Sequence, residues 1–314
     1  MMDLVFCGTP PFAVPTLQRL ATADFRIKLV VTQPDRPVGR GMELAASPIK
    51  REALRMNLPL LQPEKIKNNE ELRARLEGIR PEAIIVVGYG HIIPQWMIDL
   101  PPLGNINLHA SLLPKYRGAA PIQWAIARGE NVTGVTTMRI DAGLDTGDIL
   151  QQQEEPIRDE DTALTLAPRL AHTGAELVIT SLAGLVKGTL SLRPQDNAQA
   201  TLAPILTKED GLIDFSRSAT ESWNRLRGFQ PWPGAFTTFR GKLLHIHQAV
   251  PSPEVAVAAA GHFAVENERL LLGFAHSSAL EIRELQVEGK KRMSARDFIN
   301  GYHPRSDEPA GASG

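Results

Sequence analysis

The first half of the chain alternates short apolar runs with longer amphipathic segments, and this alternation limits the possible folds more than any other feature. The segments 12–23 and 69–79 have the apolar spacing of helices, and the second is rich in Glu and Arg. Strands that alternate with helices favour a mostly parallel sheet with helices on both faces, which binds ligands beyond the carboxyl ends of its strands. The apolar runs with the length of buried strands lie at 4–7, 27–32, 83–87 and 106–108.

The second half changes from helical to strand-like patterning. Asp161 and Thr162 are typical of a helix start, and the apolar spacing predicts one long helix that ends at Lys187 and Gly188. Pro168 either kinks this helix or moves its start. Beyond an aperiodic stretch, short alternating runs predict a small OB-like β-barrel with one helix at 219–229. The predicted barrel strands lie at 235–239, 243–248, 262–265, 270–274 and 280–285.

These patterns also set the domain boundaries. The chain has 314 residues, which at about 100–200 residues per domain is enough for two domains. We predict an α/β domain over 1–189, a linker over 190–208 and the barrel domain over 209–303. The tail, 304–314, has the composition of a disordered segment.

Charge and cysteine content exclude several classes of protein. The net charge of -1 gives no overall field that attracts nucleic acid, so a polyanionic partner has to be held by local basic patches. Cys7 is the only cysteine, which excludes a disulfide framework and a cysteine-rich metal site and fits a reducing compartment. The first residues lack a basic segment, and no apolar run approaches the roughly 20 residues that span a bilayer. We therefore expect a cytoplasmic protein without a membrane partner.

The turn that follows the first predicted strand gives a weak signal. Residues 8–12 lack both the G-x-G-x-x-G fingerprint and the lysine of a Walker A motif, which disfavours dinucleotide and nucleoside triphosphate binding. Gly8 either permits the tight turn or lets the backbone approach a ligand.

The run 105–118 contains the most informative polar residues. Side chains alternate between the two faces of a strand, so Asn105, Asn107 and His109 share one face at a sheet end. A buried and fully hydrogen-bonded polar ladder is one interpretation, because structural networks of this kind exist. A catalytic or binding site is the other.

Three carboxylates follow in the glycine-rich loop 141–148. A calcium loop needs a different order of ligands with a terminal Glu, and one His with carboxylates is a weak set of zinc ligands, so we expect no metal. The remaining interpretations are aspartates that cap turns, or one carboxylate that orients a histidine.

The run from Asn107 to His109, then Ser111 to Pro114, then the loop 141–147, resembles the folate-dependent formyltransferases. The resemblance covers nearly the whole chain. It implies an N-terminal Rossmann-like formyltransferase domain, a C-terminal barrel that helps to hold tRNA, and 10-formyltetrahydrofolate as the one-carbon donor. Further runs resemble those members of the family that formylate methionyl initiator tRNA, and they lie at 33–41, 47–50, 117–123 and 231–234.

Formyl transfer to an amine explains the polar residues. Attack on the formyl carbonyl makes a tetrahedral intermediate whose oxyanion needs preorganised donors. Asn107 donates through its amide and His109 donates when it is protonated. Asp145, if it lies near His109, favours the imidazolium and helps to take the excess proton of the attacking amine, through water. These three are the predicted catalytic residues, and we interpret Asn105 and the other aspartates of the loop as mainly structural.

The resemblance also implies where the donor binds. Two runs are matched to the folate site, mostly through backbone groups, and the glycines of the second allow close approach of the ligand. We interpret His91 as a surface or structural residue. The predicted folate-binding residues are Ser111, Leu112, Leu113, Pro114, Val87, Gly88, Tyr89 and Gly90.

Basic residues are candidates for tRNA contacts. The resemblance implies that the loop 34–47, which carries Arg36 and Arg40, enters the acceptor arm, although Met42 and Glu43 stand where relatives often have lysines. A second cluster in the barrel domain either follows the phosphate backbone or is a solvated face. It consists of Lys290, Lys291 and Arg292, and the residues that can extend it are Arg225, Arg227 and Lys242.

The remaining expectations concern aromatic residues, assembly and acceptor. Trp223 and the turn at Trp232 are interpreted as core packing in preference to base stacking, and a monomer is the expected state. The same catalytic residues suit an amino-sugar formyltransferase, whose resemblance rests on 112–118 and 231–234. A glycinamide ribonucleotide transformylase is disfavoured by the second domain, and a binding protein without turnover by the intact catalytic trio.

Overall fold

A computed structural model describes residues 1–38, 43–252, 259–306 and 308–311 of the chain. It divides into two compact units. The first unit consists of Met1–Pro121, Val132–Pro156 and Ala167–Pro204, and the second of Ile122–Asn131, Ile157–Leu166 and Ile205–Gly314. The predicted first domain therefore differs from the first unit, because two short segments of the N-terminal half belong with the C-terminal residues.

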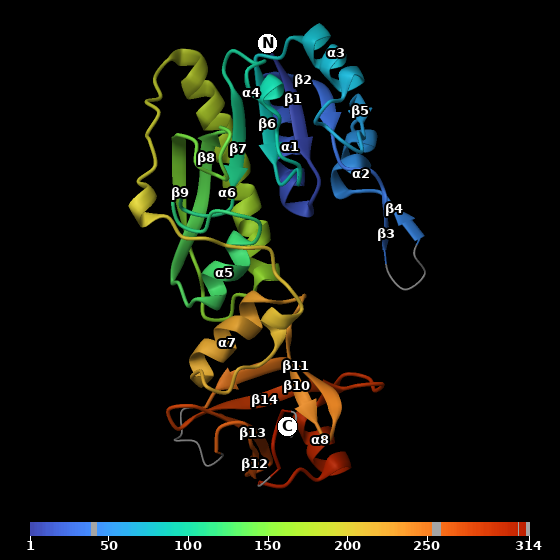
Figure 1. The fold of residues 1–314 in the computed structure, drawn as a ribbon, viewed down its shortest axis with the longest axis vertical. Coiled ribbons are helices and arrows are strands. Elements are labelled where there is room, and N and C mark those ends of the chain that lie inside the picture. Colours follow the sequence, from blue (N-terminus) through green and yellow to red (C-terminus); the bar gives the residue numbers. More distant parts are fainter. Residues whose placement is uncertain (39–42, 253–258, 307, 312–314) are drawn as a thin grey trace. The chain divides into compact units, whose positions relative to one another are not determined.

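The first unit is built on a seven-stranded sheet with the order β5-β2-β1-β6-β7-β8-β9 (Figure 1). The strands β5, β2, β1, β6 and β7 run parallel, whereas β8 runs antiparallel to both of its neighbours, β7 and β9. The mostly parallel sheet is thus confirmed. The strands span β1 Met2–Gly8, β2 Phe25–Val31, β5 Leu60–Leu61, β6 Ala83–Val87, β7 Asn105–His109, β8 Val132–Arg139 and β9 Ile149–Pro156, and a separate hairpin pairs β3 Arg36–Val38 with β4 Glu43–Ala45.

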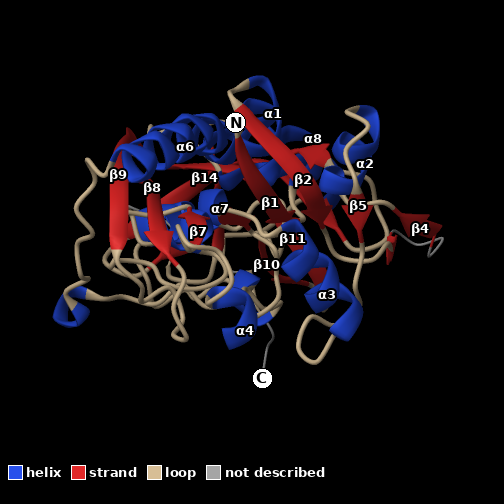
Figure 2. Cartoon of the chain, turned by 90° about the horizontal axis from the view of Figure 1, so that it is seen from above, coloured by secondary structure: helices blue, strands red, loops and turns tan. Residues whose placement is uncertain are grey.

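Helices cover both faces of this sheet, as Figure 2 shows with α1 and α6 on one face and α3 and α4 on the other. On the second face, Leu72 and Met97 share one core cluster with Val5 and Val86 of the strands. On the first face, the position of Gly174 in α6 lies directly against the side chain of Leu108. The helices of this sheet are α1 Val14–Thr22, α2 Pro48–Arg55, α3 Glu70–Ile79, α4 Gln95–Ile98 and α6 Ala163–Lys187, and the 3₁₀ turns are Pro11–Ala13 and Asn197–Gln199.

Local capping explains where several helices begin. Asn69 accepts from the backbone N–H of Leu72 and starts α3, and Ser47 does the same for Lys50 at the start of α2. The long helix α6 begins just after Thr162, as predicted, and Pro168 lies inside it near its first turn. The predicted helix at 12–23 consists of a 3₁₀ turn followed by α1, which carries a proline at its start.

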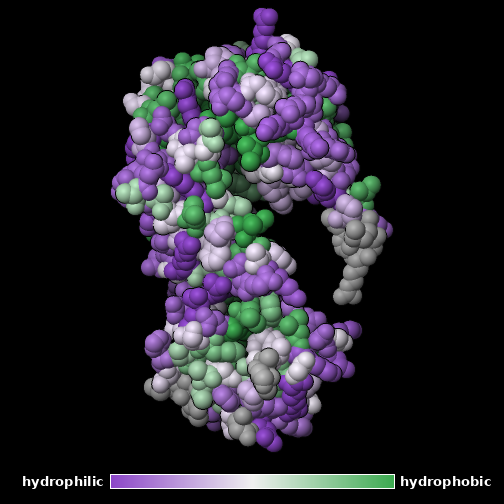
Figure 3. Space-filling model, in the orientation of Figure 1, coloured by the Kyte–Doolittle hydropathy of each residue, from purple (hydrophilic) through white to green (hydrophobic). Residues whose placement is uncertain are grey.

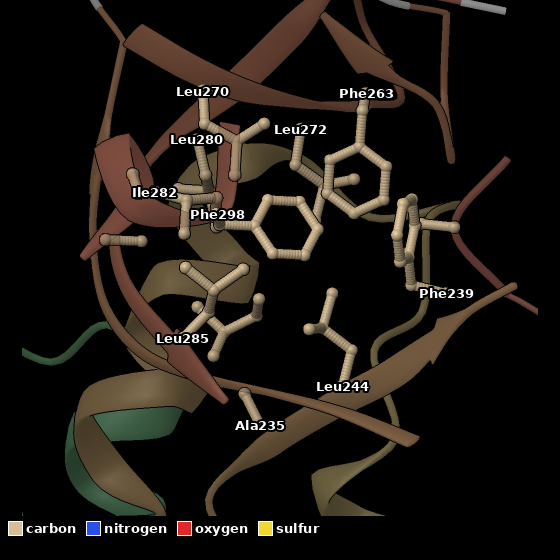
Figure 4. Packing of buried hydrophobic residues seen from close by; sticks show 14 of the residues in the cluster. Ala235, Phe239, Leu244, Phe263, Leu270, Leu272, Leu280, Ile282, Leu285 and Phe298 are labelled. Carbon is tan, nitrogen blue, oxygen red and sulfur yellow. The ribbon is translucent and has the colours of Figure 1, made fainter. Parts of the chain in front are cut away.

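The second unit contains an antiparallel sheet with the order β10-β11-β14-β13-β12, and β15 pairs with β14. The sheet curls around one apolar core, in which Phe239 of β10 lies 5.5 Å from Phe263 of β12 and both contact Phe298 (Figure 4). The predicted C-terminal β domain is confirmed. Its elements are α5 Pro121–Ala127, η3 Glu209–Gly211, α7 Ala219–Gly228, β10 Ala235–Phe239, β11 Lys242–Pro251, β12 Phe263–Glu266, β13 Arg269–Phe274, β14 Ser278–Val287, β15 Met293–Ser294 and α8 Ala295–Tyr302.

Part of the predicted disordered tail is ordered. Pro309 forms a β-bridge with His262, and the backbone N–H of Ala310 donates to Gly261 at 2.6 Å. Ala310 is buried in the core cluster, so apolar contact holds a segment whose composition suggested disorder.

Polar side chains cover most of the face that Figure 3 shows, and apolar ones lie among them in smaller groups. None of the described helices is both long and apolar enough to span a membrane.

Candidate active site

The strand β7 places its polar residues on the face that meets α4. The Asn105 amide donates to the carbonyls of Met97 and Ile98 at 2.8 and 3.1 Å, so it anchors α4 to the sheet. Asn107 is partly exposed, and within the described residues its side chain makes no hydrogen bond. The two asparagines therefore differ, because Asn107 alone keeps its amide available to a ligand.

His109 is buried at the end of β7, and its two ring nitrogens face different groups. Nε2 lies 2.8 Å from the carbonyl oxygen of Tyr116. A carbonyl only accepts, so Nε2 carries a proton in this arrangement. Nδ1 faces the Oδ2 atom of Asp145 at 3.7 Å, within ion-pair range but longer than a hydrogen bond. The structure thus brings together the predicted histidine and carboxylate.

The loop between β8 and β9 holds Asp145 in a defined conformation. Asp145 has a φ of 53°, and its Oδ2 atom accepts from the backbone N–H of Gly118 at 2.9 Å. Asp141 closes the loop by accepting from the Gly143 N–H and the Thr146 hydroxyl. At Gly147 a Cβ atom would lie 1.9 Å from the carbonyl oxygen of Arg139, so only glycine fits this turn.

Three contacts of this site were not among the predicted residues. The Tyr116 carbonyl and the Gly118 amide act through the backbone, so their residue types give no sign of the role. The third is the Gln195 side chain, which donates to the carbonyls of Asp145 and Gly147 at 2.9 and 2.7 Å. Gln195 lies in the stretch that we predicted to be a linker, and its aperiodic sequence gives no signal of this contact.

The predicted folate-binding run 111–114 is already hydrogen-bonded within the chain. The Ser111 hydroxyl donates to the Lys115 carbonyl at 2.6 Å, and the Ser111 carbonyl accepts from Thr136. The Leu113 N–H donates to the Thr136 hydroxyl, and its carbonyl accepts from the Gln152 amide at 2.8 Å. The run is therefore a rigid support beside β7 rather than a row of free donors.

The second predicted run, 87–90, differs in exposure along its length. Val87 and Tyr89 are buried, whereas Gly88 and Gly90 are exposed. The Tyr89 carbonyl accepts from the Thr9 hydroxyl and the Gln33 amide at 3.1 and 3.0 Å. The two glycines are thus the accessible part of this run, and they follow the carboxyl end of β6.

Burial governs the titratable groups near this strand end. Burial raises the pKa of the Cys7 thiol, which excludes a thiolate here, and it raises the pKa of the Tyr89 hydroxyl. Burial, followed by the positive charge of Arg36, lowers the pKa of His91. The His91 ring lies 5.2 Å from that of Tyr89, in keeping with a structural role.

The basic residues predicted for tRNA have different environments. Arg36, Lys290 and Lys291 are exposed, and Arg40 lies outside the described residues. Arg292 is exposed too, and it contacts Glu284 at 3.4 Å and the His247 ring at 3.0 Å.

Two expectations for the second unit are wrong. Arg227 is buried and donates to the carbonyls of Arg158 and Asp161, so its guanidinium serves packing and does not extend the basic cluster. The predicted core packing of the turn 232–236 fails for Trp232, which is 56% exposed, whereas Ala235 and Phe236 of the same turn are buried. Trp223 does pack against the core cluster, with the Arg227 guanidinium 4.0 Å from its ring.

Comparison with known proteins identifies the family. A profile described as formyl transferase matches residues 2–182, and one described as formyl transferase, C-terminal domain, matches residues 205–303. The chain belongs to the formyl transferase family. A protein named methionyl-tRNA formyltransferase from Koribacter versatilis is 66% identical to this chain over 99% of both chains. A protein of the same name from Acidobacterium capsulatum is 60% identical over 96% of both chains.

Solved formyl transferase structures share the fold at low sequence identity. One is WlaRD, described as a sugar 3N-formyl transferase, with a TM-score of 0.67 and 20% identity over 93% of this chain and 99% of its own. Another is an N-formyltransferase from Helicobacter canadensis, with a TM-score of 0.67 and 20% identity over 90% of this chain and 99% of its own.

Across the described residues, no group of three or more His, Cys, Asp or Glu side chains is placed to bind a metal ion.

Proposed function

We propose that this formyl transferase moves the formyl group of 10-formyltetrahydrofolate to the free amino group of methionyl initiator tRNA. The observation that carries the proposal is the 66% identity, over 99% of both chains, to a protein named methionyl-tRNA formyltransferase. The geometry around His109 agrees with this chemistry, because the histidine faces a carboxylate at 3.7 Å, and Asn107 lies two residues earlier on the same strand.

The reaction exchanges one carbon–nitrogen bond for another. The amine lone pair attacks the formyl carbon, and the carbonyl electron pair moves to the oxygen to give a tetrahedral oxyanion. When the carbonyl reforms, the bond from carbon to the folate nitrogen breaks. The attacking nitrogen loses one proton and the leaving nitrogen gains one, so the transfer needs a proton carrier but no oxidant or reductant.

The catalytic residues supply the donors and the proton carrier. Asn107 donates from its amide to the oxyanion. His109 in its imidazolium form keeps Nε2–H on the Tyr116 carbonyl, so only Nδ1–H serves the oxyanion or Asp145. Asp145 takes the excess proton of the amine through water and orients the imidazolium.

The donor is held beside this trio. The exposed Gly88 and Gly90 offer backbone groups at the end of β6, with the buried Val87 and Tyr89 supporting them. The run 111–114 shapes the neighbouring wall, and the part-buried side chain of Leu112 is its apolar contact. A folate that lies between these two runs brings its formyl group to Asn107.

The proposed acceptor contacts lie on basic residues, of which Arg36, Lys290, Lys291 and Arg292 are exposed. We propose that Arg36 and Arg40 contact phosphates of the acceptor arm, and that Lys290, Lys291 and Arg292 follow the tRNA backbone. The enzyme acts as a monomer in the cytoplasm, where a single buried thiol stays reduced.

The deciding experiment supplies formyl-labelled 10-formyltetrahydrofolate with either methionyl initiator tRNA or a UDP-4-amino-sugar. We expect label on the tRNA and none on the sugar. Label on the sugar alone would keep the catalytic trio and overturn the acceptor. No label on either acceptor, with no release of deformylated folate, would leave only a binding protein.

A further inference from the structure

We propose that Gln195 is a positioning residue for formyl transfer, because its carboxamide fixes the loop that carries Asp145 opposite His109. This inference rests on the proposed function. Gln195 lies on the segment that follows α6, drawn in yellow in Figure 1, and that segment is joined to β9 by a bridge between Arg193 and Ile149.

The amide nitrogen of Gln195 bonds to two backbone carbonyls of the loop between β8 and β9. It donates to the Asp145 carbonyl at 2.9 Å and to the Gly147 carbonyl at 2.7 Å. Asp145 has a φ of 53°, a conformation that costs a residue with a side chain some free energy even though aspartate tolerates it better than most. The two hydrogen bonds constrain this conformation, and they aim the carboxylate at His109 Nδ1.

Arg117 fixes the orientation of the Gln195 amide. Its Nε and one terminal nitrogen donate to Gln195 Oε1 at 3.1 and 2.7 Å, and the same terminal nitrogen donates to Asn197 at 2.9 Å. A guanidinium only donates, so the amide oxygen must face Arg117 and the NH₂ group must face the loop. Arg117 is 7% exposed, and no described carboxylate pairs with it, so two neutral amides are its partners.

The same segment also fixes the partner of His109. The Thr201 hydroxyl accepts from the Tyr116 N–H at 2.8 Å, and the Thr201 carbonyl accepts from the Arg117 N–H at 2.8 Å. Tyr116 has a φ of 61° and presents the carbonyl that binds His109 Nε2. The chain after α6 therefore sets both members of the pair, Asp145 through Gln195 and His109 through Tyr116.

A positioning role and a packing role predict different results. If Gln195 only links Arg117 to its surroundings, then Gln195→Glu is a good replacement, because a carboxylate accepts from the guanidinium. If the NH₂ group positions Asp145, the same variant fails, because a carboxylate cannot donate and its oxygen faces two carbonyls. Displacement of a catalytic group by about 1 Å lowers a rate by up to about 100-fold.

The experiment compares Gln195→Ala, Gln195→Glu and the control Gln199→Ala, which removes an exposed amide whose one acceptor within the described residues is Asp196. For each variant, kcat, the KM of both substrates, Tm and hydrogen exchange of the 141–148 peptide are measured. We expect both Gln195 variants to lose about 10- to 100-fold in kcat with KM within about twofold, and to exchange faster at 141–148. Gln195→Glu keeps the Tm, and the control resembles the wild type.

A wild-type kcat in Gln195→Glu would overturn the inference. It would also be overturned if the lower kcat of Gln195→Ala came with a matching fall in Tm and a rise in the KM of both substrates. If the wild-type enzyme formylates neither acceptor, the proposed function fails by itself. Hydrogen exchange then tests the inference independently, and an unchanged 141–148 peptide in Gln195→Ala would overturn it.

Discussion

His109 and Asp145 form the contact of the candidate site that is most sensitive to a single atom. Nε2 is committed to the Tyr116 carbonyl, so Nδ1 is the nitrogen that faces the carboxylate and that the proposed mechanism leaves for the substrate. Asp145 Oδ2 is shared between this nitrogen and the Gly118 N–H. Removing the charge of the carboxylate while keeping its oxygen therefore separates the two roles.

Asp145→Asn is expected to lower kcat by about 100-fold or more while the protein stays folded. The asparagine oxygen still accepts from Gly118, so the loop is retained, but the variant lacks the negative charge that, in the proposed mechanism, orients His109 and takes the amine proton. Steady-state kinetics with the purified variant, beside a thermal melt, measure this. The control is Asp148→Asn. The backbone carbonyl of Asp148 accepts a hydrogen bond from the Arg139 N–H, and this substitution leaves that carbonyl in place. Equal kcat values for the two variants would remove Asp145 from the mechanism.

Side-chain chemistry indicated the candidate trio, and backbone chemistry gave no such signal. The proposed roles of Asn107, His109 and Asp145 belong to side-chain groups that can be read from the residue type, and the structure places His109 and Asp145 3.7 Å apart. Tyr116 and Gly118 act through a carbonyl and an N–H that every residue but proline shares, so only the folded chain shows their role.

At the scale of elements, local periodicity predicted most strands and helices. The predicted strands 83–87 and 235–239 have the observed bounds. The first is a continuous apolar run, as a fully buried strand requires, and the second is a short run rich in aromatic and β-branched residues that follows a Gly and Pro turn. Helix 12–23 was predicted less well, since the prolines Pro11 and Pro15 divide it into a 3₁₀ turn and a shorter helix. Sequence periodicity could not show that 190–203 returns to the site, because its contacts are hydrogen bonds to distant residues.

The β3–β4 hairpin carries the prediction that belongs to this scale. Arg36 is exposed on β3, and Arg40, four residues later in the sequence, lies outside the described residues. Arg36→Ala is expected to raise the KM for tRNA several-fold, with kcat unchanged, and to reduce the slope of log KM against log salt by about one unit. The matched control is Arg75→Ala, which removes an exposed arginine from α3. Equal shifts in both variants would mean that the hairpin makes no phosphate contact.

At the scale of the molecule, the sequence predicted two units but not which segments make up each of them. The pattern of apolar residues changes near residue 190, which indicates a boundary along the chain. The second unit nevertheless includes Ile122–Asn131 and Ile157–Leu166. Their apolar patterns resemble those of their sequence neighbours, so only long-range packing assigns them.

That packing predicts that a fragment beginning at Ile205 is incomplete. In the second unit, the Trp124 ring lies 5.2 Å from that of Phe229, and Arg227 donates to the carbonyls of Arg158 and Asp161. The fragment 205–314 keeps α7 but loses these partners. In the fragment the Arg227 guanidinium keeps the Asn224 acceptor but loses its two carbonyl partners, and the ring of Phe229 loses its contact with Trp124.

We therefore expect the amide hydrogens of α7 to exchange at least about tenfold faster in the fragment 205–314 than in the whole chain. The strand β13 serves as the internal control, because its partners β12 and β14 are all inside the fragment and its amides should keep their protection. Hydrogen exchange followed by mass spectrometry compares both elements in one sample. Equal protection of α7 in fragment and chain would show that the two inserted segments do not stabilise it. Loss of protection in β13 as well would show instead that they are needed for the whole sheet, since its core would then depend on residues that precede Ile205.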